Sequence, residues 1–104
     1  MFIPPLTSDQ AVLMNDAPDP WTEFARELGA RMFRARAEKR MSQEQVAHAA
    51  GLATFTYRKL EKGESNPGTA ANPRLRTLVA LSDVLGIPLR DLIPTPPKGL
   101  PPGR

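Results

Sequence analysis

The residues of this 104-residue chain that could do chemistry are cationic side chains, and no catalytic set can be named. Cysteine is absent and His48 is the single histidine, so the usual Cys/His ligand set of a zinc site cannot form. Ser42 has no His and Asp partners to make it a nucleophile, and the carboxylates are scattered, not paired for acid–base catalysis. We therefore expect no enzyme activity, no cofactor and no bound metal.

Charge is unevenly distributed along the chain. Residues 1–25 contain four Asp or Glu and no Lys or Arg, whereas residues 26–62 contain nine Lys or Arg and four Asp or Glu. A basic middle segment in a chain of pI near 9.8 indicates a nucleic-acid partner, although a solvated helical surface would give the same composition. No apolar stretch reaches the roughly 18 residues of a membrane span, and the first ten residues lack signal-peptide features. We expect a cytoplasmic protein with no membrane contact.

Proline divides the chain into three parts. Residues 1–20 contain four prolines and are typical of a flexible N-terminal arm. Residues 94–104 contain five prolines and predict an extended, proline-rich tail. Residues 21–93 lie between them and have the length of one small domain. For this domain we expect an all-α fold.

Apolar residues at helical spacing predict five helices in residues 21–93, and no stretch predicts a strand. The first helix starts near Trp21, with Thr22 as its cap. The fourth carries an apolar stripe that we expect to be buried, formed by Leu75, Leu78, Leu81, Ser82 and Leu85. The fifth is a short turn with Pro88 at its first position, where proline is permitted.

The second and third predicted helices have the spacing of a helix-turn-helix. Ser42 and Gln45 form a capping box in sequence, and Gly51 can supply the positive φ of the turn. The third helix, "TFTYRKL", opens with poor helix formers. Ala53 stands before it where a capping Ser or Thr is expected. These choices indicate that the segment is selected for what it contacts.

Residues 26–93 resemble the Xre/Cro family of lambda-repressor-like helix-turn-helix domains. The matching features are Arg36 with Ser42 and Gln43, "VAHAAGL" (Val46 to Leu52), "LEKGE" (Leu60 to Glu64), and the closing "LGI". The resemblance implies a compact five-helix DNA-binding domain whose third helix lies in the major groove of double-stranded DNA.

The resemblance also assigns roles to individual residues. Base edges would be contacted by Thr54, Phe55, Arg58 and Lys59, and phosphates by Gln43, Lys62 and Asn66. Arg36 and Glu61 would form a structural salt bridge. Other interpretations remain at three places. Arg58 and Lys59 are also explained as solvated charges, Thr54 as a cap, and Phe55 as packing against the arm or a dimer partner instead of a thymine methyl.

We therefore predict a sequence-specific transcription regulator, a repressor that binds DNA as a homodimer. The candidate dimer surfaces are Val79, Val84 and parts of the fourth and fifth helices, or the Phe2–Met14 arm, which could also meet another protein. One alternative is the antitoxin of a toxin–antitoxin pair, and another is a protein-interaction module that kept the fold without the DNA. Residues 68–72 form a longer loop than the family has, and this uncharged loop either stays on the surface or reaches a phosphate or the partner subunit.

Overall fold

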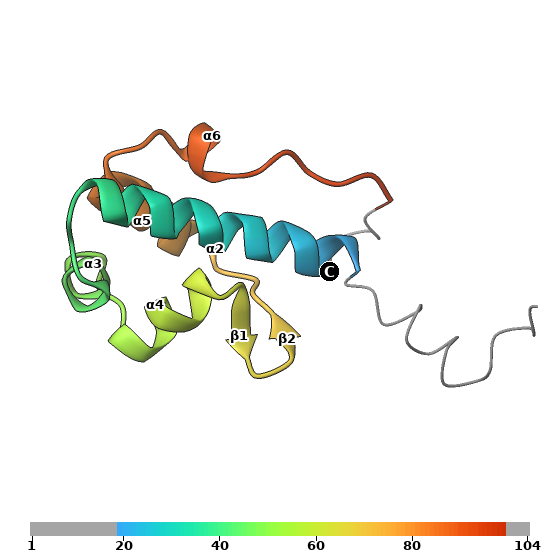
Figure 1. Ribbon diagram of the computed structural model, residues 1–104, viewed down its shortest axis with the longest axis horizontal. Helices are drawn as coiled ribbons and strands as arrows, with labels where there is room; N and C mark the ends of the chain where they lie inside the picture. Colours follow the sequence, from blue (N-terminus) through green and yellow to red (C-terminus); the bar gives the residue numbers. More distant parts are fainter. Residues whose placement is uncertain (1–18, 100–104) are drawn as a thin grey trace, which may run out of the picture.

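Helix α2 (Pro20–Glu38) forms the long axis of the fold, and the other elements lie along its length (Figure 1). The computed structural model describes residues 19–99. These contain α3 (Gln43–Ala49), α4 (Thr54–Glu61), β1 (Glu64–Asn66), β2 (Thr69–Ala70), α5 (Leu75–Leu85) and α6 (Leu89–Leu92). The predicted five-helix fold is confirmed. Most of the predicted arm and the end of the predicted tail lie outside the described residues.

The start of α2 is fixed by a residue that precedes the predicted cap. Asp19 is the N-cap, and its Oδ1 accepts a hydrogen bond from the backbone N–H of Thr22 at 2.7 Å. Pro20 takes the first helical position, where its missing N–H costs nothing. The prediction of Thr22 as the cap was therefore wrong, because Asp19, three residues earlier, caps the helix and Pro20 begins it.

The core lies where α2, α3, α4, α5 and α6 meet. Its fully buried large side chains are Met32, Val46, Tyr57, Leu81, Leu85 and Leu92. The predicted stripe of α5 is only partly correct, because Leu75 is 68% exposed. Leu75 is the first residue of α5, and the helix reaches the core only in its later turns.

The loop after α4 contains two short strands, which the sequence did not predict. Strands β1 and β2 pair antiparallel with Glu64 opposite Ala70 and Asn66 opposite Thr69. Pro67 and Gly68 make the connection, and Gly68 has a φ of 78°, the pattern of a type II turn. The hairpin forms because this turn brings together segments too short to show a strand pattern in sequence.

The second half of the longer loop is anchored to the core. Ala71 is buried, and its N–H donates to the carbonyl of Gly63 at 2.7 Å. The indole Nε1 of Trp21 donates to the carbonyl of Ala71 at 2.9 Å. These contacts tie the end of the hairpin to the start of α2, so Ala71 is part of the packed fold.

Two glycines let α4 approach α2 very closely. A Cβ at Gly29 would lie 2.5 Å from the carbonyl oxygens of Leu60 and Glu61. A Cβ at Gly63, whose φ is 77°, would lie 2.8 Å from the Cα of Arg26. The end of α4 therefore sits directly on the α2 backbone, which sets the depth at which α4 is held.

The first residues of the predicted tail return along α2 (Figure 1). Arg31 donates from Nη1 to the carbonyls of Asp91 at 3.0 Å and Ile93 at 3.2 Å. Pro94 is buried. Pro88 is the N-cap of α6 and not its first residue as predicted, because its ψ of 145° is extended. Arg31 thus fixes the chain where the proline-rich segment begins.

Candidate nucleic-acid interface

Helices α3 and α4 form a helix-turn-helix pair whose start is fixed by a capping box. Ser42 Oγ accepts from the N–H of Gln45 at 3.0 Å, and Gln45 Oε1 accepts from the N–H of Ser42 at 2.8 Å. Val46 and Ala47 are buried, and Gly51 adopts a φ of 75° in the turn. Ala47 has the small side chain that this close crossing needs.

The two sides of α4 have different roles. Tyr57 and Leu60 are buried in the core, while Phe55 and Arg58 are exposed and Lys59 is partly exposed. Thr54 is partly buried at the start of the helix. Ala53 is the N-cap and makes no side-chain capping bond, as its side chain predicts. The buried residues of α4 are thus Tyr57 and Leu60, and none of the four predicted base-contacting residues is buried.

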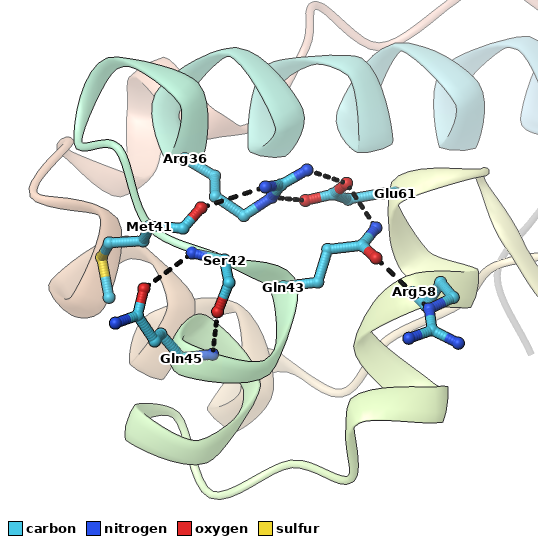
Figure 2. A network of polar contacts seen from close by, with 7 residues as sticks. All are labelled: Arg36, Met41, Ser42, Gln43, Gln45, Arg58 and Glu61. Carbon is cyan, nitrogen blue, oxygen red and sulfur yellow. Dashed lines mark hydrogen bonds and ion pairs between the residues drawn. The ribbon is translucent and has the colours of Figure 1, made fainter.

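An ion pair joins α2 to the end of α4 (Figure 2). Arg36 donates from Nε to Glu61 Oε2 at 2.6 Å and from Nη2 to Glu61 Oε1 at 3.0 Å. Its Nη1 also donates to the carbonyl of Met41 at 3.0 Å. The two side chains are only 15% and 6% exposed. This bidentate pair fixes α4 against α2 and the turn before α3.

Gln43 extends this ion pair to the outer side of α4. Its Nε2 donates to Glu61 Oε1 at 2.9 Å, and its Oε1 accepts from Arg58 Nε at 3.2 Å. The terminal nitrogens of Arg58 point away from the network (Figure 2). The predicted phosphate contact and one predicted base contact are therefore neighbours in one chain of hydrogen bonds. This link could not be predicted from the sequence, because residues 43 and 58 lie on different helices.

The ionisation of the network follows from its burial and its cations. Burial raises the pKa of Glu61, but hydrogen bonds led by that from Arg36 outweigh burial and bring the pKa below its ordinary value. The pKa of Tyr57 is raised, mainly by burial and then by the neighbouring Glu61. The Tyr57 hydroxyl has no hydrogen-bond partner among residues 19–99. Glu61 is thus held as the anion that its two donors require.

Phe55 and Lys59 form a second pair on the outer side of α4. Lys59 Nζ lies 4.2 Å from the centroid of the Phe55 ring, a cation–π distance. The ring is 66% exposed. The residues are four apart, so they lie one above the other on the same helix face. This pair presents an apolar ring beside a cation.

The two remaining predicted phosphate contacts follow α4 in the chain. Lys62 is the C-cap of α4, and Asn66 ends β1; both are exposed. Neither belongs to the network around Gln43. A cleft of about 380 Å³ between α4, β1 and the start of α5 has Lys59 and Arg74 in its lining. Arg74 is the N-cap of α5, and the sequence did not single it out.

Residues 19–99 contain no group of three or more His, Cys, Asp or Glu side chains that could hold a metal ion. No helix among them has the length and apolar character needed to cross a membrane.

Comparison with known proteins identifies the family. The pattern of the helix-turn-helix family HTH_3 matches residues 32–92. Among solved structures, the chain is similar to the restriction-modification controller protein C.AhdI from Aeromonas hydrophila, with 28% identity and a TM-score of 0.58. That match covers 66% of this chain and 96% of the other. No curated protein matches the chain. The chain belongs to the helix-turn-helix family HTH_3, the lambda-repressor-like DNA-binding domains of transcription regulators.

Proposed function

We propose that this regulator binds specific sequences in double-stranded DNA and reads the major groove with α4. The observation that carries the proposal is the network that connects Arg36, Glu61, Gln43 and Arg58. It connects the core to the guanidinium of the exposed Arg58, whose Nη1 and Nη2 point away from the network (Figure 2). A guanidinium held in this way is suited to donate two hydrogen bonds to guanine O6 and N7.

Four residues of α4 would contact bases, and residues around it would contact phosphates. Thr54, Phe55, Arg58 and Lys59 form the proposed base-contacting set. Gln43, Lys62 and Asn66 form the proposed phosphate-contacting set, with Gln43 at the start of α3. Gln43 keeps one Nε2 hydrogen beyond its bond to Glu61 for a phosphate oxygen. Phosphate contacts fix orientation, and base contacts supply specificity.

We further propose that the protein acts as a homodimer in the bacterial cytoplasm and represses transcription. One turn apart on α5, Leu75 and Val79 are 68% and 51% exposed, so a second copy could cover an apolar strip. Two copies on a two-fold site double the contacts that one small domain can make. A dimer across an operator would also exclude other proteins from that duplex, which supports repression.

Selection of bound sequences from a pool of random duplexes tests this function. The expected result is a two-fold symmetric consensus with half-sites about 10 base pairs apart, one helical turn of DNA. Arg58→Ala should lose the preference at one position of each half-site. A consensus without symmetry would contradict the dimer, and no enriched sequence would contradict specific binding.

A further inference from the structure

We propose that the Phe55–Lys59 pair recognises the C5-methyl group of a pyrimidine, either thymine or 5-methylcytosine, in the major groove. This inference rests on the proposed function, because it names the base feature that one part of α4 contacts. It selects, from the contacts that the sequence left open for Phe55, the methyl group of thymine, and extends this contact to 5-methylcytosine.

The exposure of Phe55 is not required by the fold. Tyr57 and Leu60 already supply the buried side of α4 and are fully or almost fully covered. Phe55 lies in the first turn of the helix and keeps 66% of its surface in water. Burial of apolar surface therefore does not explain an aromatic ring at this place, whereas contact with another molecule would.

Lys59 holds the ring in place and defines its surroundings. Its ammonium lies 4.2 Å from the ring centroid, and the i, i+4 spacing keeps both side chains on one face of α4. The preceding residue, Arg58, is exposed and supplies a second cation. An apolar partner protein would have to bury these charges against the ring, whereas a polyanionic duplex would be attracted to them.

The chemistry of the major groove then selects one partner for the ring. Base edges in this groove present hydrogen-bond donors and acceptors, and the apolar exception is the methyl group on C5 of thymine. A phenyl ring offers no hydrogen bond, so contact with any other edge would leave a polar group unpaired. 5-Methylcytosine carries the same methyl at the same position, so both bases share the recognised chemistry. Lys59 can donate to O6 or N7 of a neighbouring guanine while its stem stays against the ring.

The test uses the full chain and a duplex obtained by selection from a random pool. Each thymine of the duplex is replaced in turn by deoxyuridine, which removes the methyl, and each cytosine by 5-methylcytosine, which adds one. Affinity is measured by fluorescence anisotropy for the wild type, Phe55→Ala, Phe55→Leu and Phe33→Ala. Phe33 is the matched control, because it is 52% exposed and also lies beside a cation, that of Arg36. Both residues are on α2, outside the proposed base-contacting helix.

The expected result is one position in a half-site where the methyl strengthens wild-type binding about fourfold, the gain for one buried methyl group. A thymine there loses this factor on replacement by deoxyuridine, and a cytosine there gains it on methylation. Phe55→Ala should remove the difference, while Phe55→Leu and Phe33→Ala should keep it.

Two outcomes overturn the inference and leave the proposed function intact: wild-type binding that depends on no methyl group, or the full methyl effect retained in Phe55→Ala. If no duplex is enriched in the selection, both the inference and the proposed function fail. Unchanged thermal unfolding of Phe55→Ala would show that the variant is folded, as the exposure of Phe55 leads us to expect.

Discussion

At the scale of single residues, Gln43 links the buried ion pair to the exposed Arg58. Its amide bonds Glu61 on one side and Arg58 on the other, so it positions the guanidinium that would read a base. Gln43→Ala should therefore lose affinity and also relax the preference at the base read by Arg58. Removal of Arg58 itself should relax that preference by about 1–3 kcal/mol. Affinities for the selected duplex and its single-base variants measure both effects.

Lys62→Ala is the control for this coupling, because Lys62 is exposed and lies outside the network. It should weaken binding to every sequence by the same factor. In a double-mutant cycle, Gln43→Ala and Arg58→Ala should be less than additive, since both remove the same positioned group. Additive losses would contradict a positioning role for Gln43.

Glu61 should make stability depend on pH. Its pKa in the folded chain lies below the ordinary value, which is about 4.3 in an unfolded chain. Its stabilising contribution is therefore complete above the unfolded pKa and is lost as the pH falls through the folded pKa. Denaturant unfolding across pH 2–7 should show a fall in the free energy of unfolding on the acid side, and Glu61→Gln should reduce that fall.

At pH 7, Glu61→Gln should lower the free energy of unfolding by about 3–5 kcal/mol, because Arg36 keeps a mostly buried charge without its counter-ion. Glu27→Gln is the matched control. Glu27 bonds Arg31 and Arg34 but is 46% exposed, so its loss should cost less than about 1 kcal/mol. An equal decrease in the free energy of unfolding for the two variants would contradict the proposal that the Arg36–Glu61 pair stabilises the fold more than the exposed Glu27 contacts do.

At the scale of elements, the sequence predicted the helices better than their ends and connections. The capping box and the Gly51 turn could be recognised because each depends on residues that are close in sequence. The strands could not, since β1 and β2 contain only three and two residues. Leu75 is exposed because no other element within residues 19–99 covers its side chain at the start of α5. The periodic pattern predicts which residues share a helix face, but not which of them another element covers.

The start of α4 should be less stable than its later turns. Ala53 has extended N-cap geometry, with φ −66° and ψ 140°, but no side chain that can cap. Ala53→Ser should add a capping bond and raise the free energy of unfolding by about 1 kcal/mol. Amide exchange at residues 54–56 should slow in this variant, and in the wild type it should slow when DNA is bound. Strong, equal protection of the wild type with and without DNA would contradict this expectation.

Gly29 tests how closely α2 and α4 approach. Helix propensity alone would make Gly29→Ala stabilising by about 1 kcal/mol. The new Cβ would instead meet the carbonyls of Leu60 and Glu61 at 2.5 Å, and the overpacking should destabilise the protein by about 1–3 kcal/mol. The sign of the change in denaturant unfolding therefore decides the matter, and a more stable variant would contradict this crossing.

At the scale of the whole molecule, the basic composition of residues 26–62 indicated a nucleic-acid partner, and the fold shows which of the basic residues are exposed. The basic residues of the middle segment divide between structure and surface: Arg36 is committed to Glu61 and Arg31 to the carbonyls near α6, while Arg58 faces outward. Composition cannot make this division, because it depends on contacts between residues far apart in the chain. The same holds for Gln43, whose two partners lie on another helix.

The proposed function of this chain depends on sequence-specific binding of α4 to duplex DNA. The most direct test is a titration of the selected duplex and a shuffled duplex at several salt concentrations. We predict that log affinity falls linearly with log salt, by about 0.9 for each phosphate neutralised. The selected duplex should bind at least about 1,000-fold more tightly than the shuffled one. Equal affinity for the two duplexes, or no binding at micromolar protein, would contradict the claim.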